Sequence, residues 1–240
     1  MDNKIGLSDQ RITIWYGAFA DIADQERYRW HWALLDKAER ARALRYKNPL
    51  LRERYVEVHG RLRQALAQLV DEKPEKLAIK QTAHGKPYLC GFPLLAFNLS
   101  HSGKRFIIAA GFDCQLGIDI EDCRPRSNLA ALSRRCFAQE EIIYWSKLNE
   151  QAQTVEFYRF WTRKEAFVKA VGRGLALGLN QCVVNPENPS RFLRLPKDYG
   201  SAASWLIYDI ELEPAFCCAL VVDKAVSRIE FAEIDDVKLI

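Results

Sequence analysis

Hydrophobic positions along this chain switch repeatedly between a two-residue period, typical of strands, and a period near 3.6 residues, typical of helices. The pattern predicts strands at about 12–16, 97–102, 106–112, 116–121, 181–184, 205–212, 216–222 and 229–234. It predicts helices at about 24–48, 51–70, 129–136, 138–148 and 155–171. Pro49 is expected to close the first helical region, because proline cannot continue a helix. Gly172 and Gly174 are expected to end the last helix, because glycine tolerates a positive φ.

The order of these elements predicts an α+β fold with two halves packed together. Strand, helices and strands come first, and helices and strands follow again. We expect the halves, residues 1–116 and 117–240, to meet near Leu116. Seams of this kind are common ligand sites.

The composition is that of an ordinary folded protein, with 49% hydrophobic and 28% charged residues among 240. A net charge of +4 suits an anionic ligand or an acidic partner and does not by itself indicate nucleic acid. The seven cysteines form no Cys-x-x-Cys pair, and no zinc pattern is present. We therefore expect reduced thiols and a cytoplasmic protein. Cys217 and Cys218 are expected to face opposite sides of one buried strand and to carry no chemistry.

No segment is expected to act as a targeting signal or membrane span. Residues 1–6 lack the basic-then-apolar order of a signal peptide. The longest apolar runs, 106–112 and 215–222, are far shorter than the roughly 20 residues that a spanning helix needs.

Two stretches carry the candidate chemistry. In the predicted strand, Asp119 and Glu121 point to one face, because side chains alternate along a strand. In the predicted helix, Trp161, Glu165 and Lys169 recur at i, i+4 and i+8 and share a side. Carboxylates suit Mg²⁺, and a neighbouring lysine suits an anion that gains charge during reaction. Either stretch taken alone is more commonly just a solvated strand face or a surface ion pair.

Basic residues are concentrated between Lys37 and Arg63, where the arginines include positions 40, 42, 45, 52, 54, 61 and 63. A nucleic-acid-binding helix has a similar composition, and a solvated helix face is the commonest explanation of such a run. A magnesium-dependent nuclease or nucleic-acid binder therefore remains an alternative.

Four blocks resemble, in order, the motifs of the 4'-phosphopantetheinyl transferases of the surfactin-synthetase type. They are His84-Gly85-Lys86-Pro87, Phe97-Asn98-Leu99-Ser100-His101-Ser102, Gly117-Ile118-Asp119-Ile120-Glu121 and the run from Phe160 to Leu175 that contains Trp161-Thr162-Arg163-Lys164-Glu165 and Lys169. The last two blocks are specific as a pair, whereas the first two would be weak alone. The resemblance implies two similar α/β halves related by a pseudo-twofold axis, with coenzyme A bound in the cleft between them.

The resemblance also implies the site residues. Asp119, Glu121 and Glu165 would bind Mg²⁺, with Mn²⁺ as a possible substitute. Glu165 would serve as base, directly or through a water on the metal, and Lys169 would stabilise or protonate the leaving oxygen. The contacts with coenzyme A would come from Arg42, Lys86, Ser100, His101, Trp161, Lys164 and Lys169. Glu39 departs from the family pattern, so Arg45 or Arg54 could replace Arg42 near the 3'-phosphate.

Several of these assignments have ordinary structural alternatives. Without the resemblance, His101 reads as a turn histidine, Lys86 as an exposed turn lysine and Trp161 as core packing. In the resemblance the first half would hold the adenylate and 3'-phosphate, and the second would hold the metal and the catalytic helix.

The expected partner is an acyl or peptidyl carrier protein, with no nucleic acid and no membrane, and the expected state is a monomer. Carrier proteins of this kind are typically acidic, so a basic surface would favour encounter. The segment 134–147 is the expected docking surface, because charge mixes there with Phe137 and Trp145 as exposed apolar area. The alternative function is a non-catalytic module that binds coenzyme A or a carrier protein.

Overall fold

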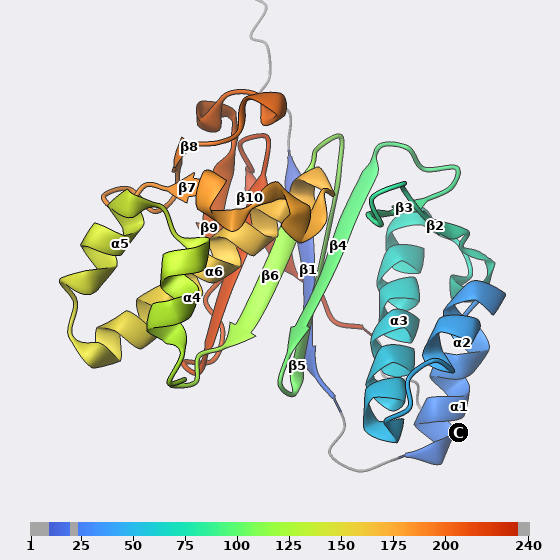
Figure 1. The fold of residues 1–240 in the computed structure, drawn as a ribbon. Helices are drawn as coiled ribbons and strands as arrows, with labels where there is room; N and C mark the ends of the chain where they lie inside the picture. Colours follow the sequence, from blue (N-terminus) through green and yellow to red (C-terminus); the bar gives the residue numbers. More distant parts are fainter. Residues whose placement is uncertain (1–9, 20–23, 235–240) are drawn as a thin grey trace, which may run out of the picture.

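Two largely antiparallel sheets form the centre of the computed structural model, which describes residues 10–19 and 24–234 (Figure 1). The first sheet has the order β11 (Arg228–Phe231), β1 (Arg11–Ala18), β5 (Arg105–Phe112) and β4 (Leu95–Ser102). The second has the order β6 (Leu116–Asp122), β10 (Phe216–Val222) and β9 (Leu206–Asp209). Within these two sheets only the β1–β11 pair is parallel, so the expected α+β class is confirmed.

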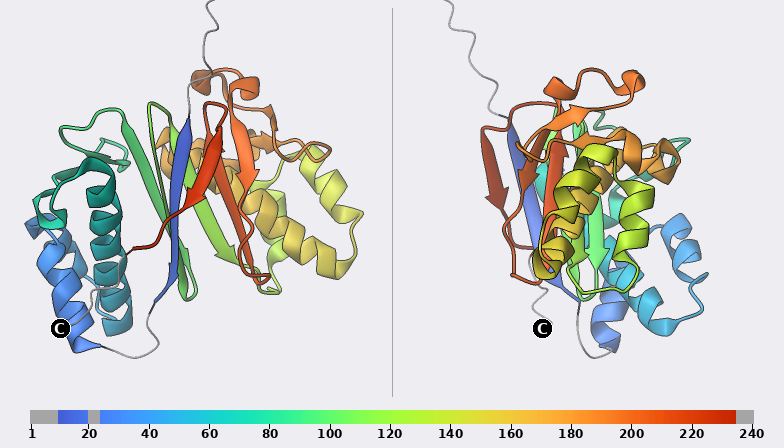
Figure 2. Two further views of the ribbon diagram at one scale, coloured as in Figure 1. Left: turned by 180° about the vertical axis from the view of Figure 1, so that it is seen from behind. Right: turned by 60° about the vertical axis from the view of Figure 1, so that its left-hand side comes forward.

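Three apolar cores hold the layers together. One core fills the space between the sheets and includes Ile14, Ile107, Ile118 and Leu220. A second packs the helix α3 (Pro49–Val70) on the outer face of the first sheet, and a third packs α6 (Glu150–Val171) on the outer face of the second. Figure 2 shows the two long helices flanking the strands from opposite sides. The alternation of apolar residues along the strands thus fills a core on each face, as expected for covered sheets.

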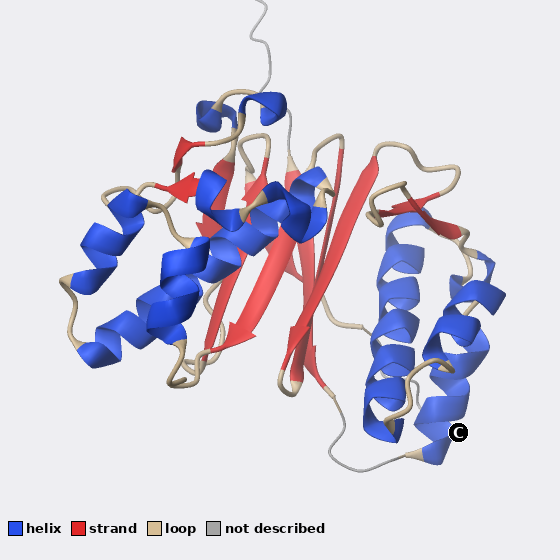
Figure 3. Ribbon diagram, in the orientation of Figure 1, coloured by secondary structure: helices blue, strands red, loops and turns tan. Residues whose placement is uncertain are grey.

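Shorter elements complete each half (Figure 3). The helices α1 (Gln25–Leu34) and α2 (Lys37–Ala43) lie beside α3, and α4 (Leu129–Cys136) and α5 (Gln139–Ser146) lie beside α6. Two small hairpins are made of β2 (Ile79–Gln81) with β3 (Pro87–Leu89) and β7 (Val183–Val184) with β8 (Phe192–Arg194). Five 3₁₀ turns are described: η1 (Pro74–Lys76), η2 (Gly174–Leu177), η3 (Leu179–Gln181), η4 (Lys197–Tyr199) and η5 (Ala202–Ser204). None of the helices described in residues 10–19 and 24–234 has the length and apolar character needed to cross a bilayer.

The first helical region differs from the expected single stretch, because it is divided at Asp36. Asp36 caps α2 through a reciprocal box with Glu39, and this pairing starts a new helix. Pro49 does not close a helix either. It occupies the first turn of α3, where its missing N–H has no intrahelical partner to lose, and Asn48 caps that helix.

The division at residue 116 stays a prediction, and the end of the chain crosses it. The segment 228–231, expected in the second half, pairs with β1 of the first sheet. Ala232 and Ile234 pack against the core beneath α3. The reason is that β1 needs a partner on the side away from β5, and the returning chain provides it. The expectation for residues 1–6 lies outside the described residues.

Candidate active site

The two halves meet where β4 and β6 run side by side without a backbone ladder between them. Alternate side chains of β4 take the place of that ladder. Asn98 Oδ1 accepts from the Ile118 N–H at 3.0 Å, Ser100 Oγ from the Ile120 N–H at 3.4 Å and Ser102 Oγ from the Asp122 N–H at 3.2 Å. These bonds satisfy buried backbone donors and hold the two strands in register.

Gly117 allows β6 to lie directly beneath α6. A Cβ at this position would come within 2.1 Å of the Ala166 carbonyl oxygen and 2.4 Å of the Ala170 nitrogen. Only glycine permits so close an approach of strand and helix. Further along β6, Asp119 and Glu121 therefore face the turn of α6 that carries Glu165 and Lys169.

Lys169 and Asp119 form the ion pair of the site. Lys169 Nζ lies 2.6 Å from Asp119 Oδ1, and it also donates to Ser100 Oγ at 2.8 Å and to the Ile118 carbonyl oxygen at 3.3 Å. Ser100 Oγ in turn lies 2.7 Å from Asp119 Oδ1. The helix, β6 and β4 thus each contribute one member of a single cluster.

Glu121 and Glu165 complete the acidic side of the site. Ser102 donates to Glu121 Oε2 at 2.7 Å, which fixes that carboxylate at the end of β6. Asp119 Oδ2 and Glu165 Oε1 are both buried, and neither has a hydrogen-bond partner. Unpaired buried carboxylate oxygens are costly, so they indicate a place where a further ligand belongs.

The three carboxylates influence one another's pKa through their negative charges. Burial raises the pKa of Glu165 to about 7, and the negative charges of Asp119 and Glu121 add to this rise while Lys169 opposes it. The pKa of Glu121 is also raised, mainly by burial and further by Asp119, against the hydrogen bond from Ser102. A cation placed among these groups would reverse both shifts.

The donor set fits Mg²⁺ in the manner usual for that ion. Within the described ranges, no three His, Cys, Asp or Glu side chains are already arranged as a closed metal cage. However, Mg²⁺ is typically held by one or two carboxylates together with substrate phosphates. The two orphaned oxygens of Asp119 and Glu165 supply that number, and Lys169 now neutralises part of the same charge.

A basic and aromatic rim extends from the site toward α2 and α3. His101 lies on the side of β4 opposite Ser100, with its ring 6.0 Å from that of Phe19. The residue is exposed, yet partial burial of its ring by surrounding residues lowers its pKa. The charges of Lys169, His59 and Arg54 lower that pKa further. The rim is therefore positive, as an anionic ligand requires.

Arg42 lies at the far end of this rim. It is exposed on α2, with its guanidinium 5.9 Å above the ring of Tyr55, and Tyr55 stacks on His59. The neighbouring Glu39 bonds Arg63 at 2.7 Å, and although burial would raise its pKa, His59, Arg63 and the Asp36 N–H lower it. Glu39 is thus a structural residue of the helix junction, and the contact of Arg42 with a phosphate remains a prediction.

The arginine-rich segment is used largely inside the protein. Arg63 is fully buried and bonds Asp36, Glu39 and two backbone carbonyls. Arg40 donates to the Trp32 carbonyl of α1, and Arg52 donates to the Tyr46 carbonyl in the loop before α3. These contacts account for much of the run without a nucleic-acid ligand.

Lys86 reaches the site's edge rather than its centre. Its ammonium bonds the Ala170 carbonyl near the C-terminal end of α6, where Gly172 ends the helix at a φ of 71°. Burial is the main cause that lowers the pKa of Lys86, with Cys114 and Asp223 opposing it. In this structure the lysine caps the negative end of the helix dipole, and its contact with a phosphate remains a prediction.

The expected phosphate contact of Lys164 is wrong. This side chain is fully buried on another face of α6, where it bonds Glu141 Oε2 at 2.6 Å, the Leu179 carbonyl at 3.0 Å and the Cys136 carbonyl at 3.2 Å. Five residues along a helix turn the side chain by about 140°, so Lys164 and Lys169 face different surroundings. Burial lowers the pKa of Lys164 and raises that of Glu141, and their attraction opposes both shifts.

Trp161 and the segment 134–147 were expected to contact coenzyme A and the carrier protein, respectively. Trp161 is half-buried against the core of the second half and stacks on Phe157 at 5.9 Å, so its contact with coenzyme A stays a prediction. Phe137 and Trp145 are buried, at 3% and 8% exposure, which is contrary to their expected part in an exposed apolar surface. Their rings fill the space between α4, α5 and α6.

Asn98 and Ser102 also position the site, although the sequence did not lead us to expect this role. Both bond the backbone of β6, and Ser102 also holds Glu121. The signal was present as the alternation Asn98-x-Ser100-x-Ser102 in a strand otherwise apolar at its centre. Polar residues with a two-residue period at an edge strand indicate a face that bonds a neighbouring element.

Known proteins are similar in sequence to this chain. A profile of the 4'-phosphopantetheinyl transferase superfamily matches residues 115–221, which include β6 and α6. A protein of Synechocystis named as a 4'-phosphopantetheinyl transferase is 35% identical over 175 residues, covering 72% of this chain and 70% of its own. The 4'-phosphopantetheinyl transferase HetI of Nostoc is 32% identical over 194 residues, covering 79% and 78%. The corresponding enzyme Sfp of Bacillus subtilis is 34% identical over 139 residues, covering 57% and 59%.

These similarities extend over most of the chain and include the strand and helix that build the acidic cluster. The chain therefore belongs to the 4'-phosphopantetheinyl transferase superfamily.

Proposed function

We propose that this chain transfers the 4'-phosphopantetheine group of coenzyme A to a serine hydroxyl of an apo carrier protein and releases 3',5'-ADP. Family membership supports the reaction class. The observation that carries the assignment of the site is the pair of buried, unpartnered carboxylate oxygens on Asp119 and Glu165 beside the Lys169 ammonium. Phosphoryl transfer requires positioning and charge stabilisation, and this cluster provides groups for both.

Glu165 is the proposed base. Its Oε1 is buried and has no hydrogen-bond partner, so it is available to accept a proton from an incoming hydroxyl group. It takes the proton of the carrier serine as the serine oxygen attacks the β-phosphorus of coenzyme A.

Lys169 is the proposed partner of the leaving group. Its ammonium is held between Asp119, Ser100 and the Ile118 carbonyl, so it is oriented before the substrate arrives. It stabilises the negative charge that develops on the oxygen of departing 3',5'-ADP.

Asp119, Glu121 and Glu165 would hold Mg²⁺, or Mn²⁺ in its place. When bound, the ion neutralises charge on the diphosphate of coenzyme A. The basic rim formed by His101, His59, Arg54 and Arg42 is proposed to receive the phosphates of the nucleotide end, with Lys86 and Ser100 nearer the diphosphate.

The finer expectations are part of the same proposal. The acceptor is an acyl or peptidyl carrier protein, the enzyme acts as a monomer, and it works in the cytoplasm. The mild positive charge of +4 supports encounter with an acidic carrier.

The test combines the purified chain with coenzyme A, Mg²⁺ and a panel of apo carrier proteins of fatty-acid and peptide-synthetase types. The expected result is a carrier whose mass increases by one phosphopantetheine group, with no increase after the divalent cation is chelated. Asp119→Ala is expected to abolish most turnover while coenzyme A binding persists. If no carrier gains mass although coenzyme A binds with similar affinity to both proteins, the chain is a binding module and the proposal fails.

A further inference from the structure

Two cysteines that the proposed reaction does not use lie against each other at the end of β6. Cys123 Sγ is 2.6 Å from Cys217 Sγ, which is only slightly longer than a covalent disulfide bond of about 2.05 Å. Both residues are free thiols in this structure. The two sulfur atoms therefore lie within reach of each other in the folded protein.

The sheet register explains why the two side chains meet. In the antiparallel pair of β6 and β10, Cys217 lies opposite Glu121. Cys123 follows Glu121 by two residues, and its N–H continues the pairing by donating to the Ala215 carbonyl at 2.8 Å. Alternation along the strands then places both sulfurs on the face covered by α6. Cys218 points to the opposite face, into the core between the sheets, as the sequence indicated.

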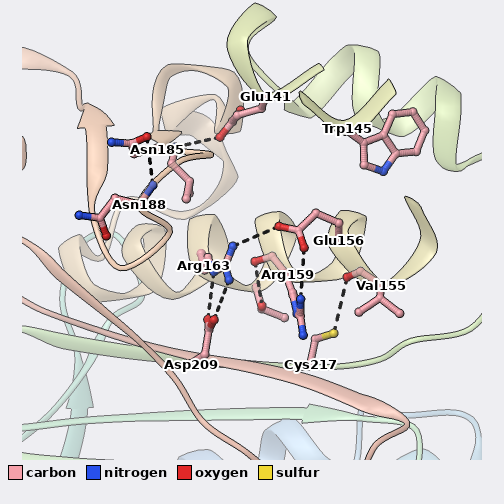
Figure 4. A network of polar contacts seen from close by, with 12 residues as sticks. Glu141, Trp145, Val155, Glu156, Arg159, Arg163, Asn185, Asn188, Asp209 and Cys217 are labelled. Carbon is pink, nitrogen blue, oxygen red and sulfur yellow. Dashed lines mark hydrogen bonds and ion pairs between the residues drawn. The ribbon is translucent and has the colours of Figure 1, made fainter. Parts of the chain in front are cut away.

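Cys217 is buried, with 8% of its surface exposed, but a hollow lies beside it. Cys217 lines a hollow of about 340 Å³ together with Val155, Arg159 and Phe216. Figure 4 shows its sulfur directed at the Val155 carbonyl, 3.7 Å away, with the Arg159 side chain alongside. Cys123 is half-buried at the neighbouring edge. A positive charge next to a thiol and an open approach are the usual surroundings of a reactive cysteine.

We propose that Cys123 and Cys217 are a thiol pair that a small disulfide, such as oxidised glutathione, converts into an intramolecular disulfide. The Cys217 thiolate attacks one sulfur of the small disulfide, and a first thiolate leaves. Cys123 then loses its proton and attacks Cys217 Sγ, which releases the second thiolate. The protein loses two protons and two electrons, and the reagent is reduced to two thiols.

The disulfide would fasten the end of β6 to β10. It closes a long loop between positions 123 and 217, which restricts the unfolded chain more than the folded one. It also lies next to Glu121, so it would rigidify the acidic end of the site. The pair itself does not depend on the proposed transferase reaction.

The experiment treats the folded, full-length protein with oxidised glutathione, alkylates the remaining thiols and maps the peptides by mass spectrometry. A linked Cys123–Cys217 peptide is expected, together with a melting temperature at least about 5 °C above that of the reduced protein. Reduction with dithiothreitol should reverse both changes. The half-buried Cys90 and Cys114 serve as internal references for general thiol oxidation.

Matched variants separate this pair from other cysteines. Cys123→Ala and Cys217→Ala should each abolish the linked peptide and the rise in melting temperature, whereas Cys218→Ala, in the next position of the same strand, should keep both. The proposal is overturned if both cysteines are alkylated in the treated wild-type protein, or if a glutathione adduct persists on Cys217 without closure.

Discussion

Two lysines of α6, five residues apart, form ion pairs of equal length that have different roles. Lys164 lies 2.6 Å from Glu141 Oε2, and Lys169 lies 2.6 Å from Asp119 Oδ1. The Lys164 pair is fully buried, and both Glu141 oxygens accept backbone N–H groups, from Ala138 and from Val184. The Lys169 pair keeps 27% exposure on the lysine and leaves one oxygen of Asp119 without a partner.

The difference shows that a buried charge pair is a structural element when every donor and acceptor is satisfied. It becomes a candidate ligand site when a donor or an acceptor is left without a partner. The Lys164–Glu141 pair, which we call the closed pair, joins α5, α6 and β7. The Lys169–Asp119 pair, which we call the open pair, joins β4, β6 and α6 at the seam, where a ligand can complete it. Figure 4 shows a further ionic contact of α6, in which Arg163 donates to Asp209 and Glu156.

The largest expected effect is a loss of activity without a loss of stability at Glu165, beside the open pair. Glu165→Gln should lower kcat by roughly 10²–10⁴-fold, because the amide cannot take up the serine proton. Its stability should not fall, because the variant removes a buried group that is costly to ionise. Transfer to an apo carrier and denaturant unfolding measure the two effects. A variant that loses stability and activity together would contradict the assignment of Glu165 to the reaction.

The closed pair should behave in the opposite way. Lys164→Ala leaves the Glu141 charge buried without its partner and should cost about 3–5 kcal/mol of unfolding free energy. The double change Lys164→Met with Glu141→Leu should recover much of that loss, since an apolar pair of similar volume suits the core. Activity per folded molecule should stay within a few-fold of the wild type. A large loss of kcat in the stable double variant would return Lys164 to the reacting groups.

The smallest effect is a pH dependence of stability at Glu165, beside the Lys169–Asp119 pair. The pKa of Glu165 rises from 4.5 to about 7 in the folded protein. The folded state therefore binds the proton more tightly, and the associated stability is complete below pH 4.5 and lost as the pH rises through 7. The difference corresponds to about 3 kcal/mol at most.

Melting temperatures between pH 5 and 8, without divalent cations, measure this dependence. The melting temperature of Glu165→Gln minus that of the wild type should grow as the pH rises, and Mg²⁺ should reduce the difference at pH 8. A difference that stays constant over this range would mean that Glu165 does not titrate near neutrality.

Most elements of the fold and the central residues of the candidate site could be predicted from the sequence alone. The period-two pattern of 116–121 and the 3.6 period of 155–171 depend on local burial, so β6 and α6 were predicted well. The motif spacing then brought Asp119, Glu121, Glu165 and Lys169 into one hypothesis. Asp36 and Glu39 also form a capping box, whose spacing of three residues could have shown the break before α2.

Other features depended on contacts between distant segments. The return of 228–231 to β1, the burial of Phe137 and Trp145 and the meeting of Cys123 with Cys217 all join residues that are far apart in the chain. Local periodicity carries no information about such partners. Lys164 is the clearest case, because its neighbours in sequence suggested a phosphate contact and its neighbours in space are Glu141 and two carbonyls.

By itself the sequence determined which segments are strands and helices and which residue types can bind metal and phosphate, because these depend on side-chain chemistry and short-range spacing. Only the tertiary structure decided which of two adjacent charges, Lys164 or Glu165, enters the core and which faces the seam. That choice depends on the angle at which α6 lies on β6, which the close approach at Gly117 permits.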